Sequence, residues 1–305
     1  MSDSIRPKSW VIFLFLLVPL ALFAFAVLVP VAQAAYSSLF EYTRENGDVF
    51  VGLKHYATLI KDSVFWNAFL NNIFLVVACI IGQIGFAFMF VMLLSSRSAK
   101  LKGLHSTVTF FPSVISAVAV GLIWKMVFDY RYGLINYFLK LFGAAKVPVW
   151  LDNPSIIMLV VSIPLIWQYI GYYMLIQSSA ISSIDKSIFE SAEMDGANAF
   201  QRATHITLPL IKDTIVVCLI LCISGNMKAF DHIWMMTKGG PGYASNLMSL
   251  YAYNTFFAYN KVGYGSAISI GILVLGLGII LLSQFLLNLL SKEKQGVKAN
   301  VKEKK

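Results

Sequence analysis

One polar segment, residues 182–209, interrupts the long apolar runs and carries several charged side chains. The segment carries Glu190, Glu193 and Asp195, followed by Arg202. Carboxylates can act as general acids or bases when a suitable partner shares the proton. Nothing in the sequence gives Glu190 or Asp195 such a reactive partner. We therefore expect these acids to hold the shape of the segment rather than to react.

Other chemical motifs are missing from the sequence. It has no G-x-x-x-x-G-K-[ST] loop for nucleotide phosphates and no G-x-S-x-G elbow for a nucleophilic serine. The four histidines lack metal-ligand spacing, and no cysteine pair completes a metal site. We therefore expect no enzyme activity, and no cofactor or metal ion bound by this chain.

The composition is that of an integral membrane protein. Hydrophobic residues make up 58% of the chain and charged residues 13%, against roughly 45–50% and 25% in soluble domains. A helix needs about 20 mostly apolar residues to cross the hydrocarbon layer. Six such runs predict six transmembrane helices, Trp10–Ala32, Asn67–Leu94, Thr107–Phe128, Ser155–Gln177, Leu210–Met236 and Gly263–Leu290. The three cysteines fall inside these runs, where we expect them to pack rather than to form disulfides.

The first apolar run has two interpretations. Arg6 and Lys8 precede it and residues 31–34 resemble a signal-peptide cleavage site. However, the run is about twice as long as the 7–15 apolar residues of a signal peptide. We interpret it as a retained first span.

Charges in the short loops predict the orientation of the chain. The loop 95–106 carries Arg97, Lys100 and Lys102 without an acid, and the tail 291–305 is rich in lysine. Both segments, together with residues 1–9, are therefore expected on the cytoplasmic side of a bacterial cell membrane. The tail can also contact anionic membrane lipid. No clustered basic domain favours a nucleic-acid partner.

The polar segment predicts a short amphipathic helix and a turn. Ser187-x-x-Glu190 has the form of a capping box, and apolar residues recur at four-residue steps from Ile184 to Ala192. Gly196 permits a tight turn. Periodicity alone fits equally well a helix that lies on the membrane surface. A second helix over about 199–206 is expected to lead to Leu208-Pro209, at the start of the fifth span.

The segment resembles the cytoplasmic signature of permease subunits of binding-protein-dependent ATP-binding-cassette importers. The family pattern is Glu-Ala-Ala, three residues, Gly, nine residues and Ile-x-Leu-Pro, and here Glu190-Ser191-Ala192, Gly196 and Ile206-Thr207-Leu208-Pro209 match it. Two mild departures are Ser191 in place of Ala and Asp185 in place of a common Pro. Met236-Thr237-Lys238-Gly239-Gly240-Pro241 resembles the sugar-permease branch, the maltose and multiple-sugar family. Three further stretches fit the same branch, Trp124–Phe128, Tyr132–Asn136 and Trp150–Pro154.

The resemblance covers the chain from Trp10 to about Leu290 and implies a set of partners. This chain would pair with a second, homologous permease subunit and with a dimer of ATPase subunits that holds the ATP and Mg²⁺. An extracytoplasmic solute-binding protein would deliver a sugar. The amphipathic helix would dock in a groove on the ATPase. The residues implied in this coupling are Phe189, Glu190, Ala192, Asp195, Gly196, Leu208 and Pro209.

Polar and aromatic residues inside the spans are candidates for the transport path, and helix–helix contacts are the competing interpretation. Rings can stack on a sugar, and amides can bond its hydroxyl groups. The candidates are Ser113, Ser116, Trp167, Gln168, Tyr169, Tyr172, Asn226 and Lys228. The resemblance also aligns Ala117, Cys222 and Ala229 with sugar-lining positions of the maltose permease subunit. These side chains bond hydroxyl groups poorly, so we expect a pocket unlike that for maltose.

Lys228 leaves two possibilities open. A cation beside the path would favour an acidic saccharide. Alternatively, Lys228 and Asp231, at i,i+3 on one helix, would neutralise each other.

The sequence thus predicts an all-α, polytopic membrane protein with six transmembrane helices and a cytoplasmic coupling helix. Residues 1–9 form the cytoplasmic N-terminus, 10–290 the permease domain with its coupling loop 182–209, and 291–305 the basic cytoplasmic tail. The favoured function is the permease subunit of an ATP-driven sugar or oligosaccharide importer. The alternatives are the same machine for an acidic saccharide, a glycerol-phosphate ester or a peptide, and a self-sufficient secondary transporter or membrane scaffold.

Overall fold

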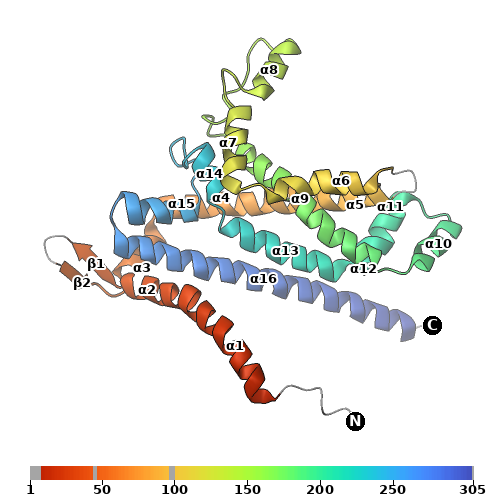
Figure 1. Cartoon of the computed structure of the whole chain (residues 1–305), viewed down its shortest axis with the longest axis horizontal. Coiled ribbons are helices and arrows are strands. Elements are labelled where there is room, and N and C mark those ends of the chain that lie inside the picture. Colours follow the sequence, from red (N-terminus) through yellow and green to blue (C-terminus); the bar gives the residue numbers. More distant parts are fainter. Residues whose placement is uncertain (1–7, 44–46, 96–99, 304–305) are drawn as a thin grey trace. The chain divides into compact units, whose positions relative to one another are not determined.

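The computed structural model describes residues 8–43, 47–95 and 100–303, with side chains throughout these ranges except at Ser9, Thr43 and 286–303. Arg6, Arg97 and the side chains of the lysine-rich tail lie outside this description, so the predicted orientation rests on the sequence. The chain divides into two compact units. Met1–Ser63 and Tyr251–Leu273 form the first unit, and Val64–Leu250 and Val274–Lys305 form the second. Figure 1 colours the chain by sequence.

The first unit combines an apolar helix with a small polar region. Its elements are α1 (Ser9–Phe23), the π-helical η1 (Ala24–Leu28), α2 (Val29–Ser37), β1 (Phe40–Thr43), β2 (Gly47–Phe50) and α3 (Lys54–Lys61). The end of α15 (Met248–Tyr253), η5 (Asn254–Ala258) and the start of α16 (Val262–Glu303) complete it. β1 and β2 form an antiparallel hairpin in which Phe40 pairs with Phe50. Asp62 accepts hydrogen bonds from the hydroxyl groups of Tyr251, at 2.6 Å, and Tyr264, which ties α3 to the later elements of this unit.

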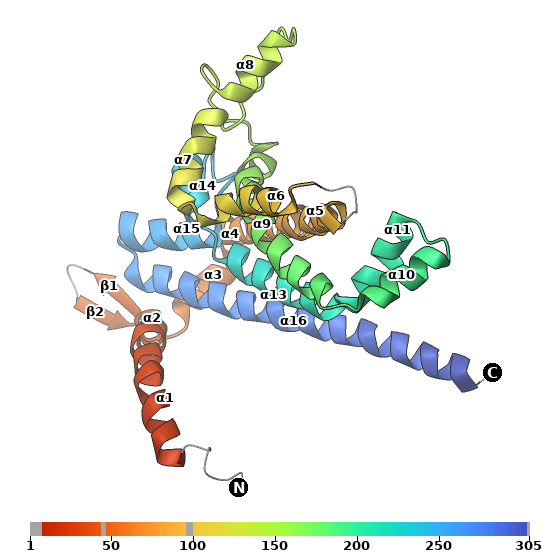
Figure 2. The same ribbon diagram turned by 45° about the vertical axis from the view of Figure 1, so that its right-hand side comes forward.

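The secondary structure of the second unit consists of helices and no strand in its described part. Its first half comprises α4 (Ser63–Cys79), η2 (Ile80–Gly85), α5 (Phe86–Ser95), α6 (Lys102–Phe110), the 3₁₀ turn η3 (Phe111–Val114), α7 (Ala117–Val127) and α8 (Leu134–Leu141). Its second half comprises α9 (Ile157–Ser182), α10 (Lys186–Met194), α11 (Ala199–Gln201), η4 (Arg202–Thr207), α12 (Leu208–Leu210), α13 (Lys212–Met227) and α14 (Asp231–Met236). Within this unit α5, α6 and α13 pack against α9, and α7 packs against α14. Figures 1 and 2 show α10 and α11 at the far end of the unit from α7 and α14.

The described residues include four helices long and apolar enough to cross a membrane: Trp10–Ser37, Ser63–Ser95, Ile157–Ser182 and Val262–Phe285. Two bent pairs raise the number to six if each pair is one span. The all-α, polytopic fold class is therefore confirmed, with the short hairpin as its one departure among the described residues.

The bent pairs correct two predicted spans. Lys102–Val114 and Ala117–Val127 meet at 100°, because the chain is extended at Ile115 and Ser116, just after Pro112. The other pair, Ala199–Leu210 and Lys212–Met227, meets at 76°. The predicted fifth span therefore does not continue to Met236: α13 ends at Met227, and residues 231–236 form the separate helix α14.

Close helix packing holds the second unit together. A Cβ atom added at Gly171 on α9 would lie 2.1 Å from the backbone oxygen of Thr109 on α6. Only glycine lets these two backbones come so near. Cys79, Cys218 and Cys222 are fully buried in the same core and carry free thiols, as predicted.

Candidate functional site

Helix α10 begins one residue before Ser187, so the predicted capping box at Ser187 and Glu190 is wrong. Asp185 is the N-cap, and its Oδ1 atom accepts a hydrogen bond from the backbone N–H of Ser187 at 2.9 Å. The aspartate satisfies an N–H group that has no partner inside the helix. Hydrogen bonds from Ser187, the backbone bond first, lower the pKa of the exposed Asp185 carboxyl group.

Gly196 makes the turn after α10. Its φ angle is +77°, in the left-handed region that favours glycine, and no atom lies within 4 Å of an added Cβ. Glycine is therefore needed here for its backbone conformation and not for space. The chain then restarts at α11 with a reciprocal capping box between Asn198 and Gln201.

The predicted second helix over about 199–206 is present but irregular. Three α-helical residues pass into the π-helical η4. Pro209 lies in the three-residue α12, and the helix breaks at Ile211. Pro209 thus lies three residues before α13, in the first arm of the bent pair Ala199–Leu210 and Lys212–Met227.

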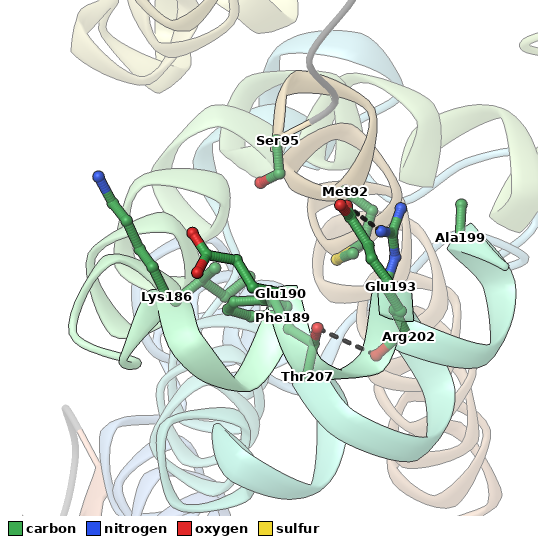
Figure 3. Close-up of a pocket in the computed structure, with 10 residues that line it drawn as sticks. Met92, Ser95, Lys186, Phe189, Glu190, Glu193, Ala199, Arg202 and Thr207 are labelled. Atoms are coloured by element: carbon green, nitrogen blue, oxygen red, sulfur yellow. Dashed lines mark hydrogen bonds and ion pairs between the residues drawn. The ribbon is translucent and has the colours of Figure 1, made fainter. Parts of the chain in front are cut away.

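A cavity of about 620 Å³ separates α10 and α11 from the ends of α5 and α9. Figure 3 shows the side chains that line it, with Glu193 and Arg202 directed toward each other. The lining residues are Met92, Ser95, Ile181, Lys186, Phe189, Glu190, Glu193, Ala199, Arg202 and Thr207.

An ion pair crosses this cavity from α10 to η4. The Nη1 atom of Arg202 donates to Oε1 of Glu193, and the Thr207 hydroxyl donates to the backbone oxygen of Arg202 at 3.1 Å. The two charged side chains are 26% and 37% exposed. A pair this exposed contributes less than about 1 kcal/mol to stability, and it joins the short helices α10 and η4.

The remaining predicted coupling residues differ in their exposure. Ala192 is buried, at 7% exposure, whereas Met194 and Phe200 are 88% and 74% exposed. Asp195 and Gly196 line a second cavity of about 320 Å³ together with Ala197, Gln201 and His205. Leu208 and Pro209 are exposed on α12. Exposed large apolar side chains on a polar segment are typical of a protein-binding surface.

The predicted transport-path residues divide by exposure. Trp167 and Tyr172 on α9 are each 38% exposed, and Ser116 and Lys228 are also exposed. Ser113 and Tyr169 are half-buried. The Trp167 ring meets that of Trp124 edge-on, with centroids 5.9 Å apart.

Gln168 and Asn226 instead make buried hydrogen bonds within the protein. Gln168 Nε2 donates to the Ile115 oxygen at 2.7 Å, and its Oε1 lies 2.6 Å from Nε2 of His232. The Asn226 amide donates to the Cys222 oxygen at 2.8 Å. Both side chains are nearly fully buried, at 1% and 6% exposure. Gln168 has the geometry of the competing interpretation, helix–helix contact, whereas the Asn226 bond stays within α13.

Lys228 and Asp231 do not form the expected pair. No ion pair joins them in the described part of the chain, because α13 ends at Met227 and Asp231 opens α14. The i,i+3 spacing holds only on a continuous helix. Both side chains are exposed.

Sequence reasoning missed several residues of the site. Met92 and Ser95 line the main cavity from the end of α5, and His232 binds Gln168. No local pattern marks them, because their partners lie on other helices. The sequence shows Arg202 and Glu193 as charges in the polar segment, but it does not predict that they form an ion pair.

The fold and the site define a class of protein: a polytopic membrane component with a projecting polar segment and no nucleotide-binding loop in its sequence. Residues 92–294 match the family model described as "Binding-protein-dependent transport system inner membrane component". The chain belongs to this family. It is therefore a transport component and not an enzyme.

Relatives of known name extend the comparison over most of the chain. A probable ABC transporter permease protein of Bacillus subtilis, YurN, is 31% identical over 269 residues, which is 87% of this chain and 92% of the relative. The trehalose/maltose transport system permease protein MalF of Thermococcus litoralis is 32% identical, over 72% of this chain and 74% of the relative. The sulfoquinovosyl glycerol transport system permease protein SmoG of Agrobacterium fabrum is 28% identical, over 84% and 83%.

Solved structures share the fold. A bacterial ABC transporter involved in the import of the acidic polysaccharide alginate matches with a TM-score of 0.80 at 22% identity, over 92% of this chain and 96% of that one. A bacterial alginate ABC transporter in complex with a periplasmic protein bound to an alginate pentasaccharide matches with a TM-score of 0.78 at 23% identity. At this identity the likeness concerns the fold.

Proposed function

We propose that this chain is the permease subunit of an ATP-driven importer that carries a sugar or oligosaccharide. Its place would be the inner membrane of a bacterial cell, with both termini in the cytoplasm. An extracytoplasmic binding protein would deliver the solute. The family match over 92–294 supports the transport role, and the named relatives for trehalose and maltose and for starch degradation products support a saccharide.

The single observation that carries the coupling part of the proposal is the geometry of residues 185–210. An aspartate-capped helix, a glycine turn at φ +77° and a second capped turn form a compact projection. Met194 and Phe200 stand exposed on it. We propose that an ATPase subunit covers these two side chains, and that the Glu193–Arg202 pair transmits its movement to α13.

The partners would be a second, homologous permease subunit and two ATPase subunits that bind ATP and Mg²⁺. The absence of a Walker loop from the sequence supports a separate source of energy. We also propose that residues 1–9 form a cytoplasmic N-terminus, 10–290 the permease domain and 291–305 a cytoplasmic tail. Helix α16 continues from the permease domain into this tail, as far as Glu303.

Copurification tests the coupling proposal. Met194→Ser with Phe200→Ser removes apolar surface without touching the membrane spans, so we expect loss of the ATPase from the purified complex. The matched control is Tyr132→Ser, because Tyr132 is also 88% exposed but lies between α7 and α8. Retention of the ATPase by the double variant would contradict the proposal.

For the transport path, the structure favours the exposed members of the predicted set. We propose that Trp167, Tyr172 and Ser116 contact the solute, that Gln168 acts through the helices it joins, and that Asn226 acts through its bond inside α13. Trp167→Ala and Tyr172→Ala should then lower uptake while the assembled complex and its ATPase activity remain. Unchanged uptake would remove α9 from the path.

An acidic saccharide is the second candidate, and exposed Lys228 favours it. Because no ion pair joins Lys228 to Asp231 in the described structure, its charge can act on a solute. Lys228→Met should reduce uptake of a uronic-acid oligosaccharide more than uptake of a neutral one. Equal effects on the two solutes would rule out this role.

A further inference from the structure

Helix α8 exposes an uninterrupted apolar stripe. Leu134, Tyr137, Phe138, Leu141 and Phe142 follow the i, i+3, i+4, i+7, i+8 spacing of one helix face. Their exposed fractions run from 47% at Phe138 to 85% at Phe142. An apolar helix face is normally buried in a core, so the stripe needs a different covering.

The opposite side of α8 is firmly attached, so the stripe cannot turn inward. The buried Asn136 donates to the backbone oxygens of Tyr130, at 3.1 Å, and Pro148, at 3.3 Å. Its Oδ1 atom accepts from the Trp150 indole at 2.7 Å. The Trp150 ring packs on buried Phe128, just past the end of α7, with centroids 6.0 Å apart. The outward direction of the stripe is therefore built into the fold.

The surroundings of the stripe carry positive charge. Between Asp129 and Asp152 the sequence contains three cations, Arg131, Lys140 and Lys146, and no acid. All three cations line one cavity of about 510 Å³ beside α8. The nearer acid, Asp129, already accepts hydrogen bonds from the backbone N–H groups of Arg131 and Tyr132. An apolar face flanked by cations matches an apolar layer bordered by anions.

The position of α8 in the chain brings such a layer within reach. It lies between α7, one half of a bent apolar pair that is a broken span or a re-entrant loop, and α9, a candidate span of 26 residues. α9 alone separates α8 from α10, so the two short helices lie on opposite sides of the membrane. Helices that lie in the membrane interface typically carry Tyr, Phe and Leu on one face and Lys and Arg on the other.

We propose that α8 is an interfacial anchor: its stripe sinks among lipid chains, and Arg131, Lys140 and Lys146 bind anionic lipid headgroups. The helix would then hold the outer end of α7, and with it the bend at Ile115, at a fixed depth. This role is independent of the transported solute, so its failure would leave the proposed function standing.

Spin-label accessibility of the complete transporter in lipid nanodiscs tests this inference. Labels go to Phe142→Cys and Tyr137→Cys on the stripe and, for comparison, to Lys140→Cys on the same helix, a change that leaves the charges of Arg131 and Lys146 in place. The native cysteines are fully buried, which favours labelling at the introduced sites. Phe142 is 85% exposed, so its replacement should not disturb folding. Collisions with apolar oxygen and with a water-soluble nickel chelate are then measured.

Lipid burial predicts high oxygen and several-fold lower nickel accessibility at Tyr137 and Phe142 than at Lys140. High nickel accessibility on the stripe would mean that it faces water and would overturn the proposal. Low accessibility to both reagents would mean that a protein covers it, which would overturn the proposal equally. With Arg131→Gln and Lys146→Gln, nickel accessibility at Phe142 should rise in nanodiscs that contain anionic lipid and not in zwitterionic ones. An equal response in both would exclude headgroup binding by these cations.

Discussion

Gln168 Oε1 and His232 Nε2 lie 2.6 Å apart and join the middle of α9 to α14. Because Gln168 Nε2 already donates to the oxygen of Ile115, its Oε1 must accept, and His232 Nε2 is the donor. One glutamine thus holds together the bend between η3 and α7 and the segment that follows α13. The side chain is 1% exposed, so its hydrogen bonds have no competitor in water.

We predict that Gln168→Leu destabilises the chain by about 1–3 kcal/mol, since it leaves a buried carbonyl and a buried imidazole unsatisfied. Thermal unfolding of the detergent-purified complex measures this. The double variant Gln168→Leu with His232→Leu removes both ends of one bond, so its loss should be smaller than the sum of the single losses. Strict additivity would contradict a direct bond.

A second prediction concerns the contact of α9 with α6. Gly171→Ala places a Cβ atom 2.1 Å from the Thr109 backbone oxygen, and overpacking of this kind typically costs about 1–3 kcal/mol. Gly225→Ala on α13 is the matched control, because no atom lies within 4 Å of its added Cβ. Alanine should be neutral or slightly stabilising there. Equal melting temperatures for the two variants would show that the close approach is absent.

A third prediction concerns the ion pair between α10 and η4. Arg202→Glu should weaken coupling of ATP hydrolysis to uptake, because it places like charges where Glu193 and Arg202 meet. The exchanged pair Glu193→Arg with Arg202→Glu should restore much of the coupling. Uptake per ATP hydrolysed in proteoliposomes is the measurement. If the exchange fails to improve on Arg202→Glu, these residues act separately.

A fourth prediction follows from the cap of α10. The pKa of Asp185 is lowered by its hydrogen bonds from Ser187, so its stabilising effect is present above the ordinary aspartate pKa of about 3.9. The effect is lost as the pH falls through the lower folded-state value. Near neutral pH the Asp185 carboxyl group stays ionised. The protection of the Ser187 and Ile188 amides from exchange, relative to the unfolded chain, should therefore not change with pH there.

Substitutions at Asp185 separate the cap from its charge. Asp185→Asn keeps an oxygen acceptor and should preserve exchange protection of α10, whereas Asp185→Ala should reduce it. Hydrogen exchange of the intact complex, followed by mass spectrometry, gives the comparison. If alanine protects the helix as well as aspartate does, the N-cap has no effect on α10.

Local signals in the sequence predicted part of this architecture. Long apolar runs predicted the four helices that are long enough to cross a membrane. The family pattern marked Gly196, and the structure shows its left-handed backbone. The capping residue of α10 was assigned wrongly, because Asp185 and Ser187 are both good caps and only the backbone path distinguishes them.

Local sequence patterns do not predict contacts between residues far apart in the chain. Gln168 is 53 residues from Ile115 and 64 from His232, so its burial could not be separated from a solute contact by sequence alone. Pro112 and the charges of Lys228 and Asp231 lie near the two breaks, but only the structure shows that the helices end at Val114 and Met227. Asn136 and Trp150 stood in two separate motifs, and only the fold joined them.

A fifth prediction concerns the turn after α10. Gly196→Val forces a branched side chain into φ +77°, at a cost of about 1–2 kcal/mol, and should separate ATP hydrolysis from uptake. Gly143→Val is the matched control, because Gly143 has φ +89° and equally open surroundings but follows α8. Equal transport by the two variants would mean that the turn has no special role.

The most direct test of the coupling mechanism is solute uptake by proteoliposomes that contain this chain, its permease partner and the binding protein, with and without the ATPase subunits. We predict saccharide accumulation only when the ATPase and ATP are both present, and its loss in the Gly196→Val variant. Accumulation without the ATPase would contradict the account, because the chain would then drive transport by itself.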